Sequence, residues 1–127
     1  MKKLLIFMFL LLTVFSYSKS TAPQANVTAA YESLSVTRPV FADVDVQKFA
    51  DDYALFVQTF VYIMNTKDKN AVGKLEALQA NIESQADLVD QKINQNPVEY
   101  QKFEAYVNQM VGILGSYEWQ LLDLFRY

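Results

Sequence analysis

Apolar side chains recur every three or four residues along three stretches of this chain. That spacing places them on one face of an α-helix, with polar residues on the other face. The first stretch begins near Asp43 or Asp45, either of which can cap the first turn of a helix. Its apolar positions are Val46, Phe49, Tyr53, Phe56, Val57, Phe60, Ile63 and Met64. We therefore predict a long helix that starts at this cap.

Two further helices follow the polar turn at residues 65–70, where Asp68 can cap the next element. The second has its apolar face at Val72, Leu75, Leu78, Ile82, Ala86, Val89 and Ile93. The third starts at Asn96, which fits the cap, and Pro97, which fits the first helical position. Glu99 can reach back to the cap. The apolar face of this helix is Phe103, Val107, Met110, Leu114, Tyr117, Leu121 and Leu124.

Short connections between the three helices favour antiparallel neighbours. The sequence therefore predicts an all-α fold, an up-down-up antiparallel three-helix bundle over residues 43–127. Residues 21–42 show no sustained helical or strand periodicity, and they contain Pro23 and Pro39. We expect a flexible or extended leader there, whose second half, Leu34 to Phe41, can lie against the bundle.

Residues 1–20 have the layout of a cleavable signal peptide. Lys2 and Lys3 precede an apolar run of twelve residues, Leu4 to Phe15, and small polar residues follow. The apolar run is shorter than the ~20 residues that span a membrane. We expect export to the periplasm or the exterior. Membrane attachment is expected only if this segment stays uncleaved.

The net negative charge of the chain argues against some classes of binding partner. Without residues 1–20 the chain loses three lysines and no acid, so its 11 basic and 14 acidic side chains become 8 and 14, a net charge of −6. Nucleic acid and anionic membrane surfaces both favour the opposite sign, so neither is expected as a partner. With no cysteine, the exported domain must be held together by apolar burial alone.

The chain offers little chemistry for catalysis. It has no histidine and no cysteine, which excludes thiol nucleophiles, Ser-His-Asp triads and the usual zinc sites. The acids at 43–45 do not follow a calcium-loop pattern and are explained by capping, while Asp51 and Asp52 are expected on a solvated face. The acids of the second helix, Glu76, Glu83, Asp87 and Asp90, likewise form a polar exterior. We expect no enzyme activity, no metal and no cofactor.

One face of the third helix is unusual. On a helical wheel Asn108, Gly112, Gly115 and Trp119 lie opposite the apolar face. Each glycine costs about 1 kcal/mol relative to alanine inside a helix. Side chains lean toward the helix N-terminus, which would lay the Trp119 ring over the glycines.

Three explanations of this face remain open. The leader can fold back and cover it. A protein partner or a second copy of the chain can bind there, since small residues permit close approach and tryptophan is a frequent hot spot. Alternatively the tryptophan is simply exposed, or the helix is kinked at the glycines.

A second candidate surface is the aromatic stripe of the first helix, Phe49, Tyr53, Phe56 and Phe60. Rings at this spacing usually form core, but they can also line a pocket for an apolar ligand or an unfolded chain. The sequence FADDYALFV at 49–57, the charged turn at 67–69 and the Gln- and Glu-rich helix that follows resemble small exported helical proteins of bacteria, most of them uncharacterised. The resemblance covers about residues 44–110, implies a helical fold and export, and transfers no catalytic residue.

The leading hypothesis is therefore an exported, non-enzymatic helical domain that binds a partner or a second copy through Asn108, Gly112, Gly115 and Trp119. The alternative is a carrier or chaperone-like protein that uses the aromatic stripe.

Overall fold

The computed structural model describes residues 25–118, and all regular structure in that range is helical. Its elements are α2 (Ala25–Leu34), α3 (Val44–Thr66), the short 3-10 helix η1 (Lys69–Ala71), α4 (Val72–Ile93) and α5 (Pro97–Gly115). The predicted all-α class is confirmed. Three of the four α-helices, α3, α4 and α5, lie in the region 43–127 where three were predicted, and α2 precedes them. The expected signal peptide at 1–20 lies outside them.

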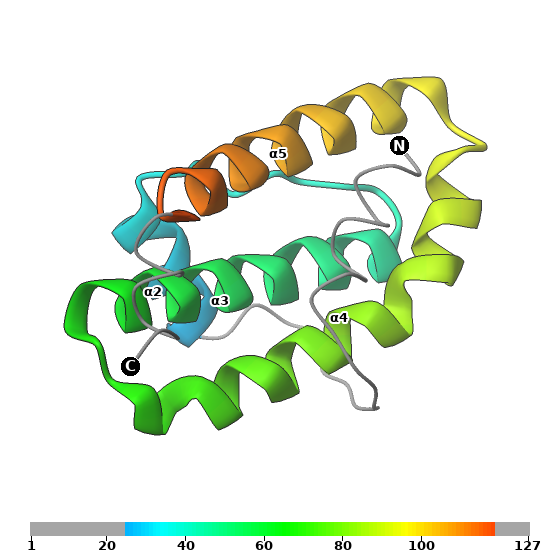
Figure 1. Cartoon of the computed structure of the whole chain (residues 1–127). Coiled ribbons are helices and arrows are strands. Elements are labelled where there is room, and N and C mark those ends of the chain that lie inside the picture. The colour runs from blue at the N-terminus through cyan, green and yellow to red at the C-terminus, as the bar shows by residue number, and fades with distance from the viewer. Residues whose placement is uncertain (1–24, 119–127) are drawn as a thin grey trace.

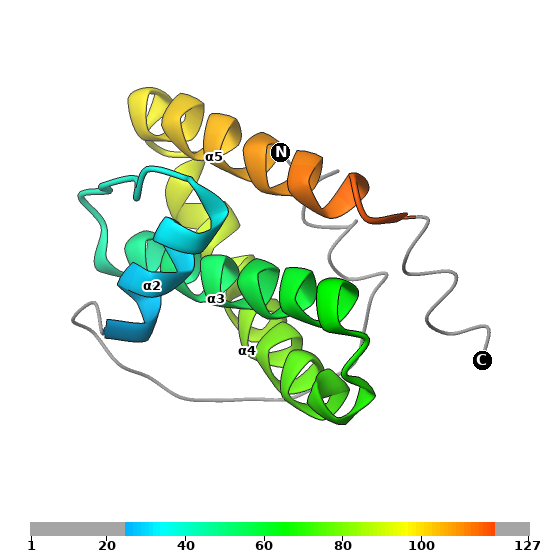
Figure 2. The same ribbon diagram turned by 90° about the vertical axis from the view of Figure 1, so that its left-hand side faces the viewer.

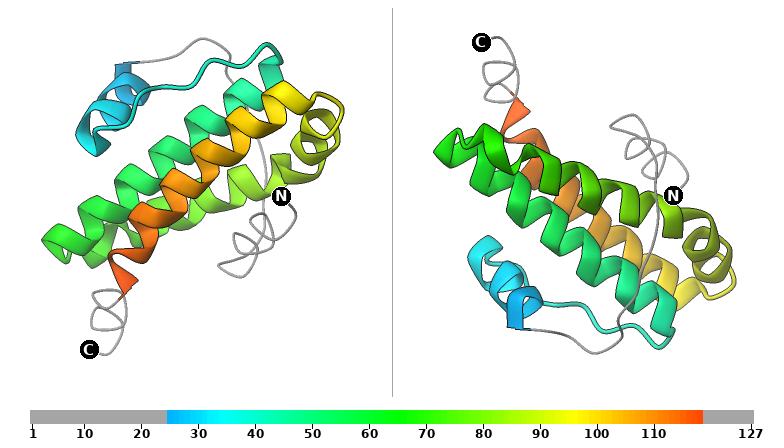
Figure 3. Two further views of the ribbon diagram at one scale, coloured as in Figure 1. Left: turned by 90° about the horizontal axis from the view of Figure 1, so that it is seen from above. Right: turned by 90° about the horizontal axis from the view of Figure 1, so that it is seen from below.

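Helix α3 is the central element of the fold and packs against α2, α4 and α5. Figure 1 shows α3 and α4 running in opposite directions, with α5 returning along α3. In Figure 3, α2 and α4 lie on opposite sides of α3. None of the helices in the described range is both long enough and apolar enough to cross a membrane.

The predicted helix starts follow from local capping. Asp43 accepts hydrogen bonds from the backbone N–H groups of Asp45 at 2.8 Å and Val46 at 3.1 Å. Asn96 accepts the N–H of Glu99 at 3.2 Å at the start of α5. Helix α3 ends where Lys67 adopts the left-handed conformation and donates its N–H to the carbonyl of Ile63.

Glu99 does not complete the predicted capping box. Its Oε1 accepts the backbone N–H of Ala42 at 2.9 Å instead of reaching back to Asn96. The carboxylate therefore joins α5 to the segment before α3. These two positions are 57 residues apart in the sequence, so local pattern could not reveal the contact.

The core is formed by the predicted apolar faces. All eight apolar positions expected in the first helix are buried in α3. In α4 the buried positions include Ile82, Ala86, Val89 and Ile93, and in α5 they include Phe103, Val107, Met110 and Leu114. The buried positions confirm the core prediction for these three helices, whereas Val72, Leu75, Leu78 and Tyr117 are only partly buried and pack against the core.

The prediction of a flexible or extended leader over 21–42 is wrong for the residues that form α2. Val27, Ala30 and Tyr31 are buried, and Leu34 is partly buried, at the i, i+3, i+4 and i+7 positions of a helical face. Four apolar positions in ten residues, one of them only an alanine, form too weak a periodic pattern to predict a helix from the sequence. The segment 35–42 that follows has no regular structure, as expected, and it buries Val36 and Phe41.

Candidate functional site

The outward face of α5 has no neighbour among the described residues. Helix α5 packs on the molecule through its buried side chains, while Asn108, Gly112 and Gly115 are exposed. A Cβ atom built on Gly112 or Gly115 would meet nothing within 4 Å. Figure 2 shows α5 as an outer element, on the far side of α3 from α4. Neither glycine is therefore required by a close contact inside the described domain.

The segment Leu34 to Phe41 does not cover this face, so the first of the three open explanations is not supported. The Phe41 ring packs on the ring of Phe103, with centroids 5.8 Å apart. Lys102 Nζ donates to the carbonyl oxygen of Val40 at 2.6 Å. Phe103 lies on the side of α5 opposite the glycines, because nine residues along a helix amount to a half turn beyond two full turns.

The predicted position of Trp119 depends on a helix that continues past the glycines. Helix α5 ends at Gly115, and Ser116 donates its N–H to the carbonyls of Gly112 and Ile113 in a turn. The described structure therefore supports the helical wheel only as far as Gly115. Trp119 itself lies outside the described residues.

The outward face of α5 is also uncharged from residue 105 onward. Residues 105–117 contain no acidic or basic side chain, in a protein with a formal net charge of −3. Charges are depleted at the centre of protein interfaces, because burying an unpaired charge is costly. This stretch can therefore approach another protein surface without that penalty.

The aromatic stripe predicted as an alternative site is part of the packed core. Its members are Phe49, Tyr53, Phe56 and Phe60, of which the most exposed is Phe60 at 7%. Tyr53 contacts the rings of Phe49 and Phe56 at centroid distances of 6.0 and 6.3 Å. Neither of the two described surface hollows is lined by any of the four.

Three buried tyrosines meet where α2, α3 and α5 come together. The Tyr106 hydroxyl donates to the carbonyl oxygen of Ala50, and the Tyr31 hydroxyl lies 3.3 Å from that of Tyr106. Tyr31 also donates to Asp51 Oδ1 at 2.9 Å. Burial raises the pKa of Tyr31, Tyr53 and Tyr106 above its ordinary value. All three hydroxyls therefore keep their protons to a higher pH than an exposed tyrosine does.

Tyr53 differs from the other two because its buried hydroxyl has no hydrogen-bond partner. We expect Tyr53→Phe to raise the free energy of unfolding by about 1 to 2 kcal/mol, since it removes an unsatisfied polar group. Tyr106→Phe, which removes a made hydrogen bond, should lower it by about 1 kcal/mol. Urea unfolding of the two variants measures both values. A Tyr53→Phe variant less stable than the parent would contradict this view of the hydroxyl.

Sequence reasoning misplaced Asp51. It was expected on a solvated face, yet its exposed fraction is 8%. Its carboxylate accepts two hydrogen bonds from Arg38, from Nε at 3.0 Å and from Nη2 at 2.8 Å. The sequence signal that was available is that Asp51 falls beside the apolar face of α3, next to Ala50 and Ala54.

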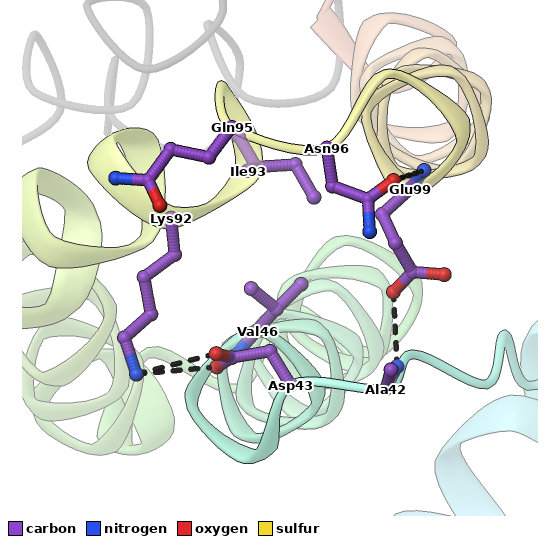
Figure 4. Close-up of a pocket in the computed structure, with 8 residues that line it drawn as sticks. All are labelled: Ala42, Asp43, Val46, Lys92, Ile93, Gln95, Asn96 and Glu99. Carbon is purple, nitrogen blue, oxygen red and sulfur yellow. Dashed lines mark hydrogen bonds and ion pairs between the residues drawn. The ribbon is translucent and has the colours of Figure 1, made fainter.

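A hollow of about 390 Å³ opens where α3 begins, α4 ends and α5 begins (Figure 4). Four of the polar side chains that line it, those of Asp43, Lys92, Asn96 and Glu99, already have partners within the protein. Asp43 pairs with Lys92 at 3.2 Å, and Asn96 and Glu99 make the contacts described above. Burial is the largest single influence on the pKa of Asp43 and opposes its ionisation, but hydrogen bonds from Val46, Lys92 and Asp45 and the charge of Lys92 together lower that pKa. These residues act as a junction of helix ends. Those lining the hollow are Ala42, Asp43, Val46, Lys92, Ile93, Gln95, Asn96 and Glu99.

Within residues 25–118, no group of three or more acidic side chains is arranged to hold a metal ion. Comparison of the chain with known protein families, with curated proteins and with solved structures gives no match. The functional proposal therefore depends on the surface and packing of this molecule alone.

Proposed function

We propose that this protein is an exported, non-enzymatic helical domain that binds a protein partner or a second copy of itself through the outward face of α5. Asn108, Gly112 and Gly115 form the described part of that contact surface, and Trp119 is the proposed anchor beside it. Export by residues 1–20, and an up-down-up bundle of α3, α4 and α5 to which α2 is added, are parts of the same proposal.

The observation that carries the proposal is the pair of exposed glycines with open space around them. A glycine inside a helix lowers stability by about 1 kcal/mol relative to alanine. Glycine is normally retained in a helix where another backbone approaches closely or where φ is positive. Neither condition is met at Gly112 or Gly115 among the described residues. A close approach by another molecule supplies the missing reason.

The direct test blocks this face with a large side chain. Gly112→Leu and Gly115→Leu should each lower the affinity for the partner or for a second copy by at least tenfold. The reason is that the leucine side chain prevents close approach of the other surface. Sedimentation of the purified protein and crosslinking in the intact cell envelope measure the two outcomes.

Ala77→Leu provides a matched control, since Ala77 is also exposed on a helix, α4. It should leave association unchanged. Gly112→Ala should raise the free energy of unfolding by about 1 kcal/mol, which separates a loss of binding from a loss of fold. If the parent protein is a monomer that captures nothing, or if the leucine variants bind as well as the parent, the proposal is wrong.

A second candidate is a carrier for an apolar ligand, with Phe49, Tyr53, Phe56 and Phe60 as its lining. The observation that favours it is the Tyr53 hydroxyl, a buried donor with no partner that a ligand oxygen can satisfy. Native mass spectrometry of protein purified from its own host tests it. A bound lipid supports the carrier, and an empty protein counts against it.

A further inference from the structure

Residues 25–42, which we name the clasp, consist of α2 and the irregular segment after it. Figure 3 shows the clasp on the side of α3 away from α4. Helix α2 docks through Val27, Ala30 and Tyr31, with Leu34 partly buried. This i, i+3, i+4, i+7 set is the anchor pattern of an amphipathic helix bound in a groove. Helix α2 thus docks on the domain in the way that a peptide helix docks in a groove, while the chain joins the clasp covalently to α3.

Beneath the clasp lies an aromatic surface shared by α3 and α5. The Tyr31 ring packs on Tyr106 with centroids 6.4 Å apart, and Phe41 packs on Phe103. Phe49 contacts Phe103 from below at 5.7 Å. Removal of the clasp would expose these rings while leaving the contact between α3 and α4 in place, because that contact is on the other side of α3.

Polar contacts fix the clasp to both α3 and α5. On α5, Lys102 holds the Val40 carbonyl and Glu99 holds the Ala42 N–H. On α3, Asp51 receives the two Arg38 hydrogen bonds and the Tyr31 hydroxyl, so a single side chain holds both parts of the clasp. Gln47, one turn earlier on α3, adds two contacts. Its Nε2 donates to the Pro39 carbonyl at 3.0 Å, and its Oε1 accepts the Phe41 N–H at 2.8 Å.

The neighbouring residue Asp52 holds a different element. Its Oδ2 accepts hydrogen bonds from Asn81 at 2.9 Å and Gln85 at 2.8 Å, both on α4, and from Lys48 of its own helix at 2.6 Å. Successive residues of a helix point about 100° apart. Asp51 and Asp52 therefore point to different sides of α3, and Asp51 holds the clasp while Asp52 holds α4.

We propose that the clasp opens as one unit while α3, α4 and α5 remain packed, with the Asp51 side chain as the latch, and that opening uncovers the aromatic surface between α3 and α5. Elements with few buried apolar anchors open at lower free energy than the centre of a fold. The clasp has five buried apolar side chains, whereas α3 alone has ten. This device goes beyond the proposed function, because it acts on a different face of α5 from the glycines.

Hydrogen exchange read by mass spectrometry tests the device on the mature chain. In the parent protein, amides of α2 should exchange at least tenfold faster than amides in the middle of α3. Asp51→Asn should accelerate exchange in the clasp about tenfold further and raise the fluorescence of 1-anilinonaphthalene-8-sulfonate. Asp52→Asn, the matched control, should accelerate exchange around residues 78–88 of α4 and leave the clasp unchanged.

Arg38→Gln gives a second route if Asp51→Asn fails to fold, because Arg38 is half-buried and belongs to the clasp itself. It should also accelerate exchange in the clasp alone. Equal exchange rates for α2 and α3, with equal dependence on denaturant, would show that the clasp opens only when the whole domain unfolds. That result overturns the proposal, as does the same exchange pattern for Asp51→Asn and Asp52→Asn.

Discussion

Phe103→Ala is expected to lower the free energy of unfolding by about 3 to 5 kcal/mol, as removal of a fully buried phenylalanine usually does. Phe103 is 0% exposed and is, with Tyr106, one of two rings through which α5 contacts both the clasp and α3. Its loss leaves a cavity that those two elements border, and they can close it only in part. A domain of this size has a total stability of about 5 to 15 kcal/mol, so the variant should be close to unfolding at room temperature.

Urea unfolding followed by circular dichroism measures this effect, and two further variants isolate its cause. Phe103→Leu retains most of the volume and should cost less than about 1.5 kcal/mol. Val98→Ala, on the same helix but 71% exposed, should change stability by no more than about 0.5 kcal/mol. A Phe103→Ala variant as stable as Val98→Ala would mean that α5 does not dock through this ring.

Alkaline conditions should unfold the protein through its buried tyrosines. Burial raises the pKa of Tyr31, Tyr53 and Tyr106 in the folded state, whereas an unfolded tyrosine ionises near pH 10. Above pH 10 the unfolded chain therefore loses protons that the folded chain keeps. Each such group lowers the free energy of unfolding by about 1.4 kcal/mol per pH unit. The three together lower it by about 4 kcal/mol per pH unit. Below pH 10 their contribution to stability is fully present.

Phenolate absorbance and circular dichroism recorded together test this expectation. The three buried tyrosines should ionise only as helical signal is lost. Tyr53→Phe should move the transition to higher pH, since one of the three groups is removed. Tyr62→Phe should leave it in place, because the Tyr62 side chain is 44% exposed. If the buried tyrosines ionise together with the exposed ones while the helices persist, the tyrosine cluster is not closed to solvent.

The clasp illustrates which errors sequence reasoning makes here. Its helix has four anchors in ten residues, and the flanking Ser, Thr and Ala residues resemble those of a flexible leader. Isolated helices this short are marginal in water, so α2 forms because α3 and α5 give its apolar face a place to pack. The sequence of residues 25–34 contains no information about the surface on which α2 packs, because α3 and α5 supply that surface.

For the candidate sites, too, the sequence predicted the residues whose placement depends on local helical spacing and missed those whose partners are distant in the chain. The exposed glycine face of α5 follows from helical spacing, and the structure places Asn108, Gly112 and Gly115 on that face. The burial of Asp51 and the contact of Glu99 with Ala42 were missed. Both acids were assigned from neighbours a few residues away, whereas their actual partners lie 13 and 57 residues away.

The sequence by itself determined the three long helices, their starts at Asp43 and Asn96, and the apolar faces that form the core. Periodicity and capping involve residues within a few positions of one another, so both can be recognised in the local sequence. Only the tertiary structure decided that α2 exists, which side of α5 the segment 34–41 occupies, and which element each of Asp51 and Asp52 holds. Those outcomes depend on burial and on partners brought together by folding, and a carboxylate is the same residue in the sequence whether it meets water or an arginine.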